Sequence, residues 1–155
     1  PCRLEILNKS PMILSDGAHN PHSAARLVEA IKELCPDSRI LLIVGVSGNK
    51  DLEGLAEKLS LLSTAGIIAT QSRHPRATKP ETVAHAFSMY NDNVNVVDSV
   101  SKALDMARDM SADTDLILVT GSLFVAAEAR EYIREIAPEI YPVFDSQATL
   151  THHNV

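Results

Sequence analysis

Two polar side chains near the start of the sequence, Asp16 and His19, have types and spacing that suit chemistry. They lie in the stretch 15–22, where a short apolar run gives way to a helical pattern. Asn20 suits the N-cap of that helix and Pro21 its first position, so helix initiation accounts for both residues. The carboxylate and the imidazole are left beside a helix N-terminus, which favours anions. They are therefore candidates for a binding or catalytic site, with a solvated loop as the alternative.

Three other stretches carry polar groups that suit an anion. Ser122, in a Thr-Gly-Ser sequence, either caps a helix or binds a carboxylate or phosphate. The loop 73–76 is the densest basic loop in the chain and suits either a polyanion or plain solvation. The segment 45–51 lacks the Gly-Lys-Ser or Gly-Lys-Thr ending of a P-loop, so an exposed helix start is favoured there. No cysteine and histidine cluster has zinc spacing, and no metal site is predicted.

The elements that must position these groups follow from hydrophobic patterning. Strand-like segments occupy 3–7, 12–15, 39–46, 66–70, 94–97 and 115–119. Apolar residues recur at helical spacing through 24–34, 52–62, 83–90, 100–107 and 125–136. The first two strands are joined by a short turn and should pair antiparallel, after which strands and helices alternate. This order predicts a mostly parallel sheet with helices on both faces.

Right-handed crossovers place every strand-to-helix loop of such a sheet at one edge. The loops at Asp16, Gly45, Gln71, Asp98 and Gly121 should therefore converge there. The crevice at this carboxyl edge is where open α/β sheets bind ligands. The candidate residues are thus expected to share one site.

Composition narrows the class of protein. The chain has 155 residues, and we predict one domain over 1–146 with a flexible tail at 147–155. Its net charge is −6, which argues against a nucleic-acid partner. Cys2 and Cys35 are too few for a disulfide scaffold and predict reduced thiols in a cytoplasmic protein. No apolar run approaches about 18 residues, so no membrane span is predicted. The first residue is Pro, which suggests processing or excision from a longer chain.

Five stretches together resemble folylpolyglutamate and dihydrofolate synthases, members of the Mur ligase superfamily. The most specific are Asp-Gly-Ala-His-Asn-Pro at 16–21 and Val-Thr-Gly-Ser-Leu at 119–123. Residues 1–5, 45–51 and 75–77 are similar to further family motifs and follow in the family's order. Cys2 and Asn49 depart from the family pattern, which has Gly and Asp there.

The resemblance implies a Rossmann-like α/β domain, with a six-stranded, mostly parallel sheet and one antiparallel N-terminal strand. It implies the C-terminal domain of a ligase in which ATP phosphorylates a carboxylate of folate or dihydropteroate and L-glutamate attacks the acyl phosphate. Arg3 would contact the ATP phosphates and Asp16 the ribose hydroxyls. His19 and Ser122 would lie near the acceptor amino acid and the reacting centre.

The same resemblance implies that the P-loop and the residues that mainly hold Mg²⁺ belong to an N-terminal region this chain lacks. We therefore expect the isolated domain to be inactive. Two alternatives stay open. One is the C-terminal domain of a ligase for peptidoglycan precursors, and the other is a free-standing Rossmann-like binding module.

Overall fold

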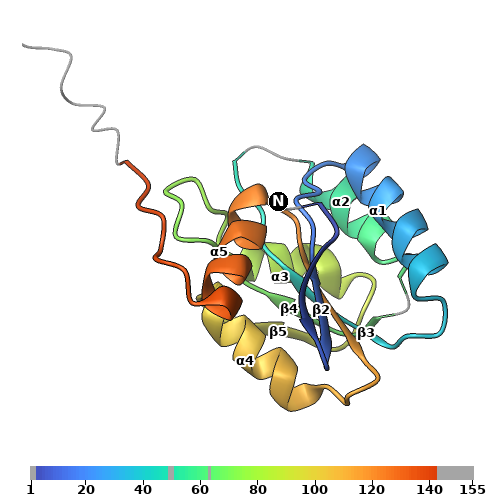
Figure 1. The fold of residues 1–155 in the computed structure, drawn as a ribbon. Coiled ribbons are helices and arrows are strands. Elements are labelled where there is room, and N and C mark those ends of the chain that lie inside the picture. Colours follow the sequence, from blue (N-terminus) through green and yellow to red (C-terminus); the bar gives the residue numbers. More distant parts are fainter. Residues whose placement is uncertain (1–2, 49–50, 63, 143–155) are drawn as a thin grey trace, which may run out of the picture.

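The computed structural model describes residues 3–48, 51–62 and 64–142 (Figure 1). The strands are β1 (Glu5–Lys9), β2 (Met12–Ser15), β3 (Ile40–Val44), β4 (Thr64–Ala69), β5 (Val94–Val96) and β6 (Leu116–Thr120). The helices are α1 (Pro21–Leu34), α2 (Leu52–Leu59), α3 (Pro80–Ser88), α4 (Val100–Met110) and α5 (Leu123–Arg134). The described residues leave out the predicted tail 147–155, residues 143–144 of the extended segment that the sequence predicts at 141–144, and the motif residues Cys2, Asn49 and Lys50.

The six strands form one sheet in the order β1-β2-β6-β3-β4-β5. β1 pairs antiparallel with β2, and all other neighbours pair parallel. The two central strands, β3 and β6, are buried along their whole length because both of their faces are covered. The expected mostly parallel α/β sheet with one antiparallel N-terminal strand is confirmed.

Helices cover both faces of this sheet (Figure 1). Buried residues of α1, α2 and α3 pack on one face around Leu42, Ile67 and Leu118. Buried residues of α4 and α5 pack on the other face around Leu41 and Ile117. Alternate residues of β3 and β6 thus enter opposite cores, as the pleat of a strand requires. The rigid sheet fixes where the loops at its edge begin.

Four apolar positions predicted to face the core are exposed instead. Leu34 is 64% exposed because it is the last residue of α1. Tyr90 is 49% exposed, since α3 ends at Ser88 and the helical phase is lost. Ile136 and Tyr132 are also exposed: the first lies beyond the end of α5, and the hydroxyl of the second donates to Asp105 on α4. Helical spacing predicted where these helices lie, but it also predicted burial for apolar residues that do not face the core.

Candidate active site

The loops after β2, β3 and β6 meet at the carboxyl edge of the sheet. The amide N of Asp16 donates to the carbonyl O of Val119 at 3.0 Å, and that of Gly121 donates to Ala18 O at 3.0 Å. The amide N of Gly45 donates to Thr120 O at 3.3 Å. The predicted convergence of these three loops is therefore confirmed by direct hydrogen bonds.

The other two predicted loops lie farther along the same edge. Gln71 Nε2 donates to the carbonyl O of Asp98 at 3.3 Å, which joins the loops after β4 and β5. Three strands separate β5 from β2, which corresponds to about 19 Å at the usual strand spacing. The Asp98 loop is therefore too remote to contact a ligand bound at Asp16.

The carboxylate of Asp16 holds the start of β1 against the loop after β2. Its Oδ2 accepts the amide N–H of Leu4 at 3.0 Å, and its Oδ1 accepts that of Ala18 at 2.8 Å. These bonds fix the backbone next to Arg3. Each carboxylate oxygen has two lone pairs, so each retains one for an external donor.

The imidazole of His19 is oriented by its own loop. Its Nδ1 lies 3.0 Å from the carbonyl O of Gly17, which can only accept, so Nδ1 carries the proton in that contact. Nε2 of the neutral ring is then a free hydrogen-bond acceptor. The predicted cap follows directly: Asn20 Oδ1 accepts the Ser23 amide N–H at 2.8 Å, completing a capping box.

Ser122 is the N-cap of α5, as one of its two interpretations predicts. Its Oγ accepts the amide N–H of Phe124 at 3.1 Å, and its side chain is buried. The same Oγ lies 3.3 Å from Ser47 Oγ, in the loop after β3. Ser47 was not among the predicted site residues, although its place directly after a buried strand was a signal.

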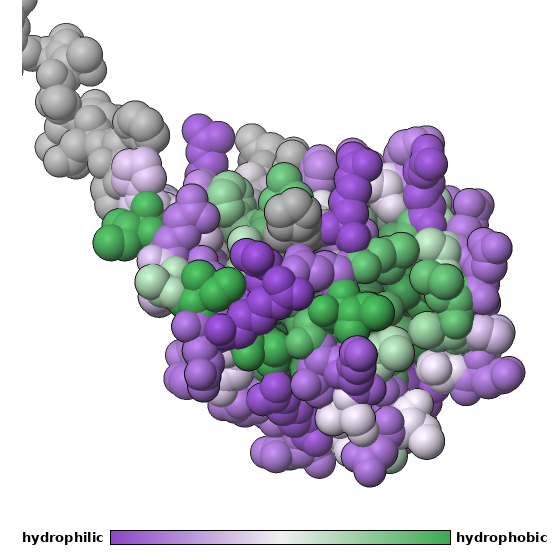
Figure 2. All heavy atoms as spheres, viewed as in Figure 1, coloured by the Kyte–Doolittle hydropathy of each residue, from purple (hydrophilic) through white to green (hydrophobic). Residues whose placement is uncertain are grey.

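Two adjoining cavities bring these groups together. The larger measures about 740 Å³ and is lined by Arg3, Asp16, His19 and Arg26, with apolar contributions from Leu4, Ala18, Leu27 and Ala30. The smaller measures about 120 Å³ and is lined by His19, Ser47, Gly121, Ser122, Leu123 and Phe124. His19 and Leu123 line both. Figure 2 shows an apolar band bordered by hydrophilic residues on the face that carries the β1–β2 hairpin and α1.

Charge is uneven around the larger cavity. Within the part of the chain that the structure describes, neither Arg3 nor Arg26 forms an ion pair. Asp16 is the acidic residue of the lining, and both of its oxygens already accept backbone N–H groups. The cavity thus offers two guanidinium groups to a ligand, which suits phosphate or carboxylate oxygens.

In the basic loop 73–76, Arg76 is exposed, as plain solvation predicts, but Arg73 fits neither predicted interpretation. Arg73 pairs within the chain, with Nη1 3.4 Å from Glu128 Oε1 and Nη2 2.8 Å from Glu131 Oε2. The ring of His74 stacks on Phe124, with centroids 4.0 Å apart. Burial raises the pKa of Glu128, and Arg73 opposes that shift. Glu128 was not among the predicted site residues, although its position, three residues after Val125 and one before Ala129, borders the predicted inward face of its helix.

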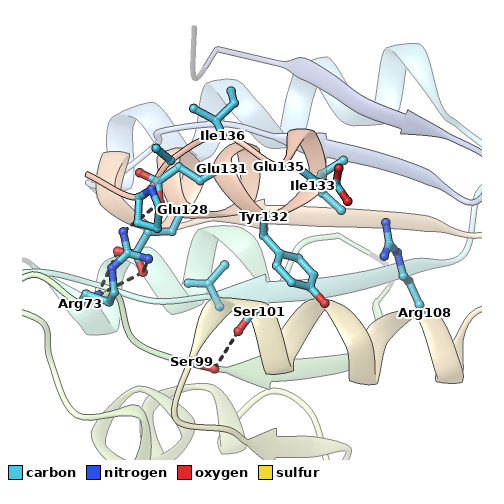
Figure 3. A pocket seen from close by; sticks show the side chains of 13 residues that line it. Arg73, Ser99, Ser101, Arg108, Glu128, Glu131, Tyr132, Ile133, Glu135 and Ile136 are labelled. Atoms are coloured by element: carbon cyan, nitrogen blue, oxygen red, sulfur yellow. Dashed lines mark hydrogen bonds and ion pairs between the residues drawn. The ribbon is translucent and has the colours of Figure 1, made fainter. Parts of the chain in front are cut away.

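A cavity of about 890 Å³ lies between α4 and α5 (Figure 3). It contains none of the four predicted site residues, and of its two arginines, Arg73 and Arg108, the first is already paired with Glu128 and Glu131. Among residues 3–48, 51–62 and 64–142, no group of three or more His, Cys, Asp and Glu is arranged to hold a metal ion. No helix in the same ranges is long and apolar enough to span a bilayer.

A sheet of this strand order, with its candidate groups on the loops after β2, β3 and β6, is typical of an α/β domain that binds a ligand at the carboxyl edge of its strands. Residues 2–123 match the family model for the Mur ligase glutamate ligase domain, and the chain belongs to that family.

Curated relatives place it more narrowly. The chain is 31% identical over 133 residues to the dihydrofolate synthase/folylpolyglutamate synthase of Escherichia coli, a match that covers 86% of this chain and 30% of the relative. It is also 31% identical over 158 residues to a probable bifunctional folylpolyglutamate synthase/dihydropteroate synthase of Haloferax volcanii, covering 100% of this chain and 18% of that protein.

Solved structures agree with these relatives. Folylpolyglutamate synthase of Mycobacterium tuberculosis in complex with ADP superposes with a TM-score of 0.80 at 26% identity, over 86% of this chain and 32% of that one. E. coli FolC in complex with DHPP and ADP gives 0.78 at 30% identity, over 87% and 31%. The chain therefore spans about a third or less of the length of these proteins.

Proposed function

We propose that this chain is the C-terminal domain of an ATP-dependent ligase that adds L-glutamate to folate or dihydropteroate through an acyl phosphate. The observation that carries the proposal is the meeting of the Asp16–His19 loop with the Ser122 cap at two adjoining cavities that share His19. The relatives named above are folate-type synthases, which favours a folate-type acceptor over a peptidoglycan precursor.

The larger cavity suits a nucleotide. The guanidinium groups of Arg3 and Arg26 match phosphate oxygens, and the free lone pairs of Asp16 match a ribose diol. Apolar side chains such as Leu27 line the same cavity and suit the face of a base. Nucleotide contact by Arg3 and Asp16 fits the ADP present in the complexes of the M. tuberculosis and E. coli relatives.

The smaller cavity suits the amino group and a carboxylate of the incoming glutamate. Because Nδ1 of His19 donates to Gly17 O, Nε2 is the ring atom left to accept an ammonium proton, and the N-terminus of α5 at Ser122 favours a carboxylate. ATP would convert the acid to an acyl phosphate, and the glutamate nitrogen would then displace phosphate from the acyl carbon. In this proposal the chain orients the nitrogen and stabilises charge, with no protein nucleophile.

Among the described residues, no group of three or more His, Cys, Asp and Glu could hold a metal ion by itself. We assign the metal and the P-loop to an N-terminal region of the same enzyme, so the domain works as a partner of that region and is inactive alone. The test is ATP-dependent addition of glutamate, measured with this chain and with the longer ligase that contains it. Activity of the longer protein only is expected, and activity of this chain alone would contradict the proposal.

A further inference from the structure

A buried carboxylate on α5, Glu128, has no part in the function proposed above. Only 4% of its side chain is exposed. Burying a carboxylate is costly unless partners compensate for its lost hydration. The partners of Glu128 therefore indicate what the residue holds in place.

Three groups from two other segments converge on this carboxylate. The amide N of Arg73 donates to Oε2 at 2.9 Å, and the guanidinium of the same residue lies 3.4 Å from Oε1. The hydroxyl of Tyr141 donates to Oε2 at 3.2 Å. Figure 3 shows Arg73 directed at Glu128 and Glu131 on α5. Glu128 thus fastens the loop after β4 and the segment beyond α5 to the same helix.

The first path from Glu128 to the small cavity is aromatic. His74, next to Arg73, stacks on Phe124 at 4.0 Å with 19° between the ring planes. Tyr141 meets the edges of both rings at 5.2 and 5.3 Å. Phe124 is itself a wall of the 120 Å³ cavity. Both rings that support this wall are therefore fixed through groups bonded to Glu128.

The second path runs through the backbone. The amide N of Gly48 donates to Arg76 O at 2.9 Å, and that of Thr78 donates to Val46 O at 2.8 Å. Between these bonds lies Ser47, whose Oγ is 3.3 Å from Ser122 Oγ. The loop after β4 is thus held at one point by Glu128 and at another by the segment 46–48. Because Ser122 caps α5 and Glu128 lies within the same helix, both paths begin on α5 and end at residues that line the cavity.

We propose that Glu128 is a positioning residue that keeps Phe124 and Ser47 in place as walls of the small cavity and so sets affinity for the acceptor amino acid. It touches no reactant and acts only through Arg73 and Tyr141. The identity of the occupant rests on the proposed function, whereas the contact network does not. The nucleotide cavity shares only His19 and Leu123 with the small one, so nucleotide affinity is independent of Glu128.

The test is Glu128→Gln in the full ligase. The KM for glutamate should rise about tenfold while the KM for ATP changes by less than about twofold. Glu131→Gln is the matched control, since it removes an ion pair with the guanidinium of Arg73 but leaves the backbone amide of Arg73 bonded to Glu128. Asp115→Asn is the stability control, because it removes another buried, paired carboxylate at the opposite edge of the sheet. Neither control should raise the KM for glutamate by more than about twofold.

An equal rise in the KM for glutamate in Glu128→Gln and Asp115→Asn would overturn the inference, because the effect would then be general destabilisation. Should Glu128→Gln fail to fold, Tyr141→Phe removes only the hydroxyl bonded to Glu128. It should raise the KM about threefold, and an unchanged KM would equally overturn the inference.

Hydrogen exchange on the same full-length proteins separates this inference from the proposed function. Exchange of the amides in 46–48 and 76–78 should accelerate in Glu128→Gln and stay unchanged in Glu131→Gln. If the parent protein had no ligase activity but exchange still accelerated in Glu128→Gln, the proposed function would be refuted and the positioning role supported. Unchanged exchange would overturn the positioning role whatever the activity.

Discussion

Gly121→Ala should destabilise the fold strongly, because Gly121 combines a positive φ with a very close neighbour. Its φ is +105°, a conformation that residues with a Cβ rarely adopt. A Cβ would also lie 2.3 Å from Gly45 O and 3.0 Å from Val44 Cγ2. Backbone strain costs about 1–3 kcal/mol and overpacking about 1–3 kcal/mol, so we expect a loss of about 4 kcal/mol in the free energy of unfolding.

Gly48→Ala is the matched control for that substitution. Gly48 also has a positive φ, +68°, but a Cβ there meets nothing within 4 Å. Its cost should be the strain alone, about 1 kcal/mol. In a domain of this size each kcal/mol lowers Tm by about 2–4 °C, so the expected falls are about 8–16 °C for Gly121→Ala and 2–4 °C for Gly48→Ala. Equal falls in thermal unfolding would refute the close approach of the loops after β3 and β6.

Two smaller perturbations test other parts of the fold. Arg39 lowers the pKa of Asp115 below its ordinary value of 3.8. The pair therefore stabilises the fold above that value and loses its effect as the pH falls through the lower folded-state pKa. Urea unfolding should show a stability loss in Asp115→Asn at neutral pH that shrinks in strong acid, and a pH-independent loss would contradict the pairing. Asn20→Ala should cost about 1 kcal/mol by removing the cap of α1, while Asn20→Ser should retain most of it; equal urea midpoints for Asn20→Ala and the parent would argue against the cap.

Local patterns predicted the elements that matter most for the site. Asn20 and Pro21 begin α1, and Ser122 begins α5, because caps depend on the residue itself and on its nearest neighbours. The aliphatic runs of β3 and β6 predicted buried central strands for the same local reason. Since parallel strands end at one edge, the convergence of Asp16 and Gly121 followed from chain order alone.

Contacts made across the fold were not predictable in this way. Nothing near Arg73 in the sequence indicates that its partners lie 55 and 58 residues away on α5. Glu128 gave one usable signal, a charged residue at an inward position between Val125 and Ala129. The sequence predicts an extended, packed segment at 141–144, but it does not indicate that the ring of Tyr141 packs against His74 and Phe124, which come from two separate segments. The sequence likewise did not predict that both carboxylate oxygens of Asp16 accept backbone N–H groups, from Leu4 and Ala18.

We infer that His19 serves the reaction rather than the fold. The most direct measurement is the rate of ATP-dependent glutamate addition by the full ligase carrying His19→Ala, with His85→Ala on the exposed side of α3 as control. We expect kcat to fall by about 100-fold in His19→Ala, with Tm within about 2 °C of the parent, and no change in kcat for the control. An unchanged rate in His19→Ala would make the imidazole an ordinary loop side chain and contradict its proposed role in the reaction.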